Sequence, residues 1–114
     1  MSARRRRAAY TDEAQEDLRD ALHFTEQNWG REQRSAYQRL LRQTVRTLTG
    51  SPLIGRSREG ISPGLRSHPA ASHVIYYWVI DEVVTVARIL HSRRDASSIS
   101  WTMPIDDIDT AKSQ

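Results

Sequence analysis

The stretch from His73 to Ile80 constrains the fold most, because its residues predict a strand that is apolar on both faces. It is rich in β-branched and aromatic residues and has the length of a strand. Alternate side chains of a strand point to opposite faces of its sheet. One face carries Ile75, Tyr77 and Val79, and the other carries Val74, Tyr76, Trp78 and Ile80. Each face of the sheet therefore needs an apolar cover.

A helix that precedes this strand can supply part of one cover. Thr11 is a good N-cap, and two acidic residues follow it at the positive end of the helix dipole. Small and apolar residues then recur at steps of three and four as far as Trp29, which places them on one stripe. We expect Trp29 to pack in the core and Gly30 to end the helix in a left-handed conformation.

A second run, from about Glu32 to Thr49, has the clearest helical pattern in the sequence. The residues of its buried stripe are Tyr37, Leu40, Leu41, Thr44, Val45 and Leu48. The arginines off that stripe are expected to form its solvated side, and they are Arg34, Arg39, Arg42 and Arg46. Because only one or two residues separate the two helices, the helices must fold back on each other as an antiparallel hairpin.

A loop and a β-hairpin follow the helices. Glycine and proline residues predict a loop over residues 50–64. Residues 65–68 have the character of a short strand, which Pro69 interrupts. The polar pair at 81–82 predicts a turn after the central strand, and residues 83–91 supply the returning strand of a hairpin.

The second face of the predicted sheet has no obvious cover within the chain. We expect residues 1–95 to form one domain and residues 96–114 to be a flexible tail. The helical hairpin can cover only one face, so Tyr76 and Trp78 predict a surface for a partner, since exposed aromatic residues at such density are typical of interfaces. The alternative is that the tail folds across this face with Trp101.

The composition excludes several kinds of site. The chain has no cysteine, which removes disulfides, thiolate metal sites and thiol nucleophiles and is typical of the reducing cytoplasm. The four histidines lack HExxH spacing, and no phosphate-binding glycine loop or GxSxG elbow occurs. No apolar run approaches the roughly 20 residues of a membrane span. We therefore expect a cytoplasmic protein that uses no metal or cofactor and does not enter a membrane.

The charges are distributed unevenly along the chain. Residues 1–94 hold 16 basic and 10 acidic side chains, whereas the segment from Asp95 holds one basic and four acidic side chains. A basic body favours an anionic partner, which can be nucleic acid, a negatively charged protein segment or an acidic groove. The arginine run at 4–7 is either an arm that grips phosphates or a solvated terminus.

Several segments between Tyr10 and Asp95 stand out when they are taken together. In order, they are YTDEAQEDL, WG, SPLIGRSREG and GLRSHPAASHVIYYWVIDEVVTVARILHSRRD. This series resembles the ParE branch of the ParE/RelE superfamily, the toxins of bacterial type II toxin–antitoxin modules. The resemblance implies an α+β fold, in which a strand near residues 4–10 joins the C-terminal strands in a small antiparallel sheet packed on the helical hairpin.

The resemblance also implies a toxin that acts by binding rather than by turnover. Members of this branch inhibit DNA gyrase, and a ParD-like antitoxin wraps and neutralises the toxin. Acidic antitoxin residues would meet the arginines near the sheet, while aromatic residues of the sheet and tail would make apolar contacts. The residues expected to bind antitoxin or target are Arg66, Tyr76, Trp78, Arg88, Arg93, Arg94 and Trp101.

Two other functions stay open at this point. The RelE branch cuts messenger RNA on the ribosome, which requires a base, an acid and a cation around the reacting phosphate. Residue types of that kind are supplied by Glu59, Arg66, Arg88 and His91. Against this function, the chain lacks the His-Tyr or Arg-with-Tyr ending of many RNA-cutting relatives. The third function is that of a non-toxic relative that only binds an antitoxin.

Overall fold

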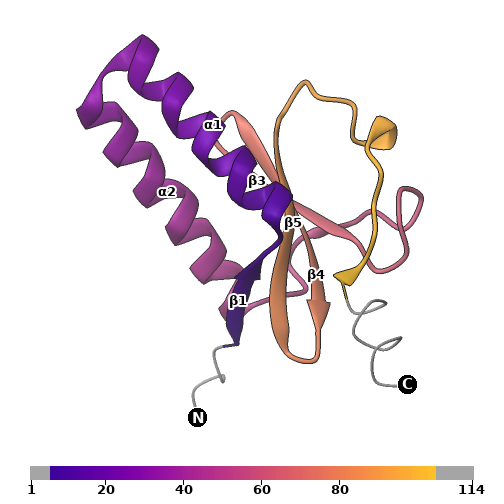
Figure 1. Ribbon diagram of the computed structural model, residues 1–114. Coiled ribbons are helices and arrows are strands. Elements are labelled where there is room, and N and C mark those ends of the chain that lie inside the picture. Colours follow the sequence, from indigo (N-terminus) through magenta and orange to yellow (C-terminus); the bar gives the residue numbers. More distant parts are fainter. Residues whose placement is uncertain (1–5, 105–114) are drawn as a thin grey trace.

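Two long helices lie against one face of a five-stranded sheet in the computed structural model, which describes residues 6 to 104 (Figure 1). The elements are β1 (Arg7–Tyr10), α1 (Asp12–Trp29), α2 (Arg31–Gly50), β2 (Arg56–Ser57), β3 (Arg66–Ala70), β4 (His73–Ile80), β5 (Val83–His91) and a short 3-10 helix (Ala96–Ser98). The strand order in the sheet is β1-β5-β4-β3-β2. This arrangement confirms the predicted α+β class, with a helical hairpin packed on a small sheet.

The direction of β1 differs from the expectation. β1 runs parallel to β5, with Tyr10 opposite Val86, whereas the other neighbouring strands are antiparallel. The sheet is therefore mixed, and the wholly antiparallel sheet that the resemblance implied is wrong. Most of the domain separates these two strands in sequence, so no tight turn fixes their relative direction. The strand expected near residues 4–10 begins at Arg7, and residues 1–5 lie outside the described residues.

The ends of the helices follow local sequence signals. The Thr11 hydroxyl accepts a hydrogen bond of 3.0 Å from the backbone N–H of Ala14, as an N-cap does. Gly30 joins the two helices with a φ of 95°, a value that glycine adopts without steric cost. Within residues 6 to 104, no helix is both long and apolar enough to cross a lipid bilayer.

Trp29 does not pack in the core as predicted. It is the last residue of α1, where the helical hairpin extends past the sheet (Figure 1), and its exposed fraction is 71%. The stripe of α1 therefore contacts the sheet only along its earlier turns.

The first core lies between the helices and the sheet. Its buried residues are Ala14, Leu41, Val45, Leu48, Ala70, Ile75, Tyr77, Val84, Val86 and Ile89. Tyr77 also fixes the loop after α2, because its hydroxyl donates to the Pro52 carbonyl at 2.7 Å and accepts from the Gly55 N–H at 3.0 Å. A Cβ at position 55 would overlap the Tyr77 ring, so the loop approaches this closely only with glycine there.

The β-hairpin has the predicted bounds, but β3 is longer than predicted. Asp81 and Glu82 form the hairpin turn with φ values of 48° and 64°, the positive values that a two-residue turn of type I′ requires. The interruption of β3 at Pro69 is wrong, since the strand continues through it to Ala70. β2 pairs only with the first two residues of β3. Pro69 therefore lies on a free edge, where the missing N–H breaks no hydrogen bond of the sheet.

The second face of the sheet is covered by the chain itself, through a segment from Ala96 to Met103 that we call the C-terminal strap. The buried residues of this second core are Leu65, Tyr76, Trp78, Ala87, Leu90 and Ala96. Ile61, Val74, Ile80, Ile99, Trp101 and Met103 pack against them. The exposed fractions of Tyr76 and Trp78 are only 5% and 2%. The predicted open aromatic surface is therefore wrong, and the alternative cover by Trp101 is confirmed.

A capped turn directs the C-terminal strap back to the sheet. Asp95 caps the 3-10 helix. The Trp101 indole N–H then donates to the Ala96 carbonyl at 3.0 Å, and the centre of its ring lies 5.3 Å from that of Tyr76. The strap packs on the sheet, and residues 105–114 lie outside the described part of the chain, so the flexible tail over residues 96–114 stays a prediction.

Trp101→Ala should lower the free energy of unfolding by about 1–3 kcal/mol, because it removes a half-buried ring from the second core. Urea unfolding measures this loss. The matched control is Trp29→Ala, the same substitution at an exposed ring, which should change stability by no more than about 0.5 kcal/mol. Equal losses in the two variants would contradict the packing role of the strap.

Candidate functional site

A groove opens between the helical hairpin and the end of the sheet at which β5 finishes. Its volume is about 850 Å³, which lies within the range of sites that hold ligands or anchor side chains. We call it the α1 groove. The lining residues that bear on function are Phe24 and Trp29 of α1, Tyr37 of α2, His73 and His91 of the sheet, and Arg94 just beyond β5.

Two exposed aromatic side chains stand on the α1 wall of this groove. The exposed fractions of Phe24 and Trp29 are 63% and 71%. Large aromatic side chains that lie open to solvent beside a concave surface are typical anchors of protein interfaces. The α1 groove therefore offers two apolar anchor points to a partner.

The floor of the groove is a hydrogen-bonded polar cluster. The Tyr37 hydroxyl lies 2.6 Å from Nδ1 of His73 and 3.3 Å from the Ala70 carbonyl. His73 and His91 are cross-strand partners whose rings meet edge to face, with centres 5.6 Å apart. Burial lowers the pKa of His73, the neighbouring His91 adds to the effect, and Asp17 opposes it. The His73 ring is therefore neutral at pH 7 and contributes hydrogen bonds rather than charge.

Donors and a cation lie at the β5 end of the groove. Nδ1 of His91 accepts a hydrogen bond of 3.2 Å from the backbone N–H of Arg93. This bond orients the His91 ring at the end of β5. Arg93 and Arg94 are both exposed, and Arg94 lines the groove. The exposed Asp20 also lines the groove, so the groove offers charges of both signs, with Arg94 as the group that can meet an acidic side chain.

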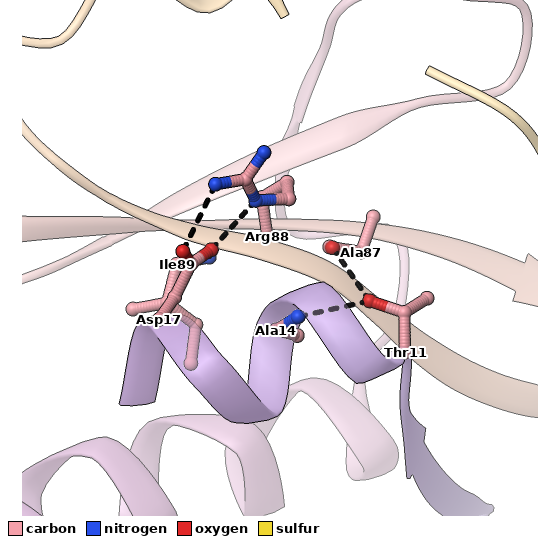
Figure 2. Close-up of polar contacts among 6 residues, drawn as sticks. All are labelled: Thr11, Ala14, Asp17, Ala87, Arg88 and Ile89. Atoms are coloured by element: carbon pink, nitrogen blue, oxygen red, sulfur yellow. Dashed lines mark hydrogen bonds and ion pairs between the residues drawn. The ribbon is translucent and has the colours of Figure 1, made fainter. Parts of the chain in front are cut away.

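An ion pair fixes α1 against β5 beside the groove (Figure 2). The Asp17 carboxylate accepts hydrogen bonds of 2.7 and 2.9 Å from the Arg88 guanidinium and one of 3.0 Å from the backbone N–H of Ile89. Both charged side chains are mostly buried. The hydrogen bonds to Asp17 raise the pKa of Arg88, while burial opposes them. The pair holds the groove wall in place because it joins a helix and a strand that are far apart in sequence.

Thr11 completes the same edge of β5 (Figure 2). β1 ends at Tyr10, so the next residues of β5 have no neighbouring strand on that side. The backbone N–H of Thr11 donates to the Val86 carbonyl at 3.0 Å, and its hydroxyl donates to the Ala87 carbonyl at 2.8 Å. Thr11 therefore both caps α1 and satisfies the edge of the sheet.

The aromatic residues predicted from sequence as contacts are not available to a partner. Tyr76 and Trp78 lie in the second core, and Trp101 is half-buried in the C-terminal strap above them. The chain's own segment occupies the face on which a partner was expected.

The predicted arginines fall into two groups. Arg88 is bound to Asp17, and Arg66 donates to two backbone carbonyls of the loop after α2 at 2.7 and 3.3 Å. Arg93 and Arg94 are exposed, and they stay predicted contact residues. Of the seven residues predicted from sequence, only Arg94 lines the α1 groove.

Sequence reasoning missed the aromatic anchors. Phe24 lies off the regular apolar stripe of α1. An aromatic residue outside the buried stripe of a helix points toward solvent, so its position in the sequence could have predicted the exposed site. Trp29 lies on the stripe, so its exposure depends on where the sheet ends and not on local sequence.

Most of the side chains considered for RNA cleavage form hydrogen bonds or ion pairs within the protein. The Glu59 carboxylate accepts from the Gly64 N–H at 2.7 Å. The guanidinium groups of Arg66 and Arg88 bind a loop and Asp17, as described above. Within residues 6–104, no three His, Cys, Asp or Glu side chains lie close enough to hold a metal ion.

Comparisons with known proteins agree on one family. The family model described as "ParE toxin of type II toxin-antitoxin system, parDE" matches residues 8–96. Toxin ParE1 of Mycobacterium tuberculosis (strain H37Rv) is 36% identical over 83 residues, which cover 72% of this chain and 85% of that protein. Toxin ParE1 of Caulobacter vibrioides is 35% identical over 83 residues, covering 73% of this chain and 85% of that protein.

A solved structure supports the fold independently of sequence. A chain of the chromosomal ParDE TA system from P. aeruginosa matches with a TM-score of 0.66 at 18% identity, covering 75% of this chain and 95% of that chain. At this identity the match bears on the fold alone.

Asp17→Ala should lower the free energy of unfolding by about 2–4 kcal/mol, because it leaves the buried Arg88 charge and the Ile89 N–H without their partner. Chemical unfolding measures the loss. Asp20→Ala is the control, an exposed acidic residue on the same helix that should cost no more than about 0.5 kcal/mol. A similar cost for both substitutions would show that the pair does not hold α1 to β5.

Proposed function

The chain belongs to the ParE toxin family of type II toxin–antitoxin systems, and from this membership we propose that it inhibits DNA gyrase by binding, without catalytic turnover. We propose further that a ParD-like antitoxin neutralises it by occupying the α1 groove. The toxin then acts in the cytoplasm, where gyrase and its DNA are found.

The α1 groove is the observation that carries the antitoxin proposal. Phe24 and Trp29 offer exposed aromatic anchors, and an isolated toxin that keeps two such residues open gains stability when a partner covers them. Arg94 lines the groove, and Arg93 precedes it in the sequence and is exposed. A segment with apolar residues for the anchors and an acidic residue for these arginines fits both features.

The hydrogen bonds and ion pairs of the candidate catalytic residues support inhibition by binding. A ribonuclease needs a free acid, base and cation that converge on one phosphate. In this chain Glu59, Arg66 and Arg88 each hold a separate part of the scaffold together. Their bonds favour a structural role for them, and so favour a toxin that acts through its surface.

The purified chain should abolish supercoiling by DNA gyrase, and added antitoxin should restore it. A translation reaction with a readout of message cleavage is run beside the supercoiling assay, and the message should stay intact. Cut message with normal supercoiling would instead indicate a RelE-like endoribonuclease. No effect in either assay would indicate a non-toxic relative that only binds an antitoxin.

Phe24→Ala and Trp29→Ala should each weaken binding of the antitoxin encoded beside this toxin about 10- to 100-fold, as loss of an interface anchor does. Isothermal titration calorimetry measures the affinity. The control is Leu53→Ala, which removes an apolar side chain with an exposed fraction of 70% from the loop after α2, away from the groove. If all three variants bind as the wild type does, the antitoxin does not occupy the α1 groove.

A further inference from the structure

The loop after α2, from Pro52 to Gly55, displays two neighbouring apolar side chains that the fold does not bury. The exposed fractions of Leu53 and Ile54 are 70% and 49%. Within residues 6–104, the large apolar side chains that are exposed are Phe24, Trp29, Leu40, Leu53, Ile54 and Val79. The two aromatic ones line the α1 groove, and the two that lie outside both the groove and the loop come singly in the sequence. Single exposed apolar residues are normal on a protein surface, whereas adjacent ones form a patch of the kind that partners use.

Two side chains of the sheet hold the backbone of this loop in place. Tyr77 is fully buried, and its hydroxyl bonds to both Pro52 and Gly55, as described above. The Arg66 guanidinium donates to the carbonyl of Gly55 at 2.7 Å and to that of Leu53 at 3.3 Å. Because these bonds fix the loop before any partner arrives, a partner that covers its side chains does not have to order its backbone. The entropy cost of binding at this loop is therefore low.

The charges in and after this loop are mostly positive. Residues 51–66 contain the arginines Arg56, Arg58 and Arg66 and one acidic residue, Glu59. Within the described part of the chain, none of these three arginines takes part in an ion pair. Arg56 directly follows the loop and is exposed. The apolar pair is therefore bordered by positive charge that the fold does not neutralise.

The loop lies far from the α1 groove. Gln33 and Tyr37, in the first half of α2, line the groove, whereas the loop follows the last turn of this helix, at the opposite end of the helical hairpin from Gly30 (Figure 1). The helix from Tyr37 to Gly50 is about 20 Å long. A segment that fills the groove therefore leaves the loop open to another partner.

We propose that the loop after α2 is the surface by which the toxin contacts its protein target, with Leu53 and Ile54 entering an apolar pocket whose rim carries acidic side chains. The inference rests on the proposed function, because it assigns a contact surface to the target of that function. The positive charges disfavour a second copy of this chain, since a two-fold contact around the loop would bring like charges together. Nucleic acid is a poorer match, because the loop carries aliphatic side chains in place of aromatic rings that stack on bases.

Inhibition of DNA gyrase supercoiling by the full chain tests the proposal. The double variant Leu53→Ala with Ile54→Ala should raise the concentration needed for half-inhibition about 10- to 100-fold, because it removes both side chains that enter the pocket. Arg56→Gln should raise that concentration several-fold at low salt and less at high salt, whereas Arg56→Lys keeps the charge and should inhibit as the wild type does. The antitoxin affinity of each variant, measured by isothermal titration calorimetry, should be unchanged, which verifies that the fold is kept.

The matched control is Leu40→Ala, which removes an apolar side chain with an exposed fraction of 40% from α2 and should leave inhibition unchanged. If the wild type inhibits gyrase and the loop variant inhibits as strongly, or if the control loses as much, the loop is not the contact surface and the proposed function still stands. If the loop variant loses antitoxin affinity in the same proportion as inhibition, the loop belongs to the antitoxin interface instead. If the wild type does not inhibit gyrase, the proposed function is wrong, and the assignment of the loop is overturned with it.

Discussion

Covering both faces of β4 is the constraint on which the rest of this structure depends. The strand is apolar on each side, so the sheet must lie between two layers. The helical hairpin forms one layer, and the C-terminal strap with the loop before β3 forms the other. Because the chain supplies both covers, the aromatic residues of the sheet stabilise the fold and are not kept for a partner. The exposed aromatic residues Phe24 and Trp29 lie instead in the second half of α1, toward the end where the helical hairpin extends past the sheet (Figure 1).

The segments that resemble the toxin family mark the points where distant parts of the chain meet. Asp17 from the first segment binds Arg88 from the last, and Tyr77 binds the loop between Pro52 and Gly55. These contacts are buried, and their geometry depends on residue type, so they favour one fold strongly. They leave the surface free to vary. A resemblance that is carried by such residues is therefore strong evidence for the fold and weaker evidence for the contact residues.

The sequence predicted the local features of this protein and missed those that depend on distant segments. The cap at Thr11, the turn at Gly30 and the hairpin around 81–82 are set by neighbouring residues, and the structure confirms them. The direction of β1 depends on strand pairing across the whole domain, which no local pattern records. The exposure of Trp29 depends on where the sheet ends. The α1 groove was missed for the same reason. Its residues come from helices, strands and a turn, and they come together only in the folded chain.

The α1 groove differs in chemistry from the two cores of the domain. Phe24 and Trp29 of α1 are exposed there, whereas Tyr37 of α2 and His73 of β4 bond to each other at its floor. The groove combines aromatic anchors with a few polar groups, an arrangement that gives tight and specific binding. Because the polar groups at the floor of the groove already have internal partners, its exposed aromatic rings gain most when a partner covers the groove.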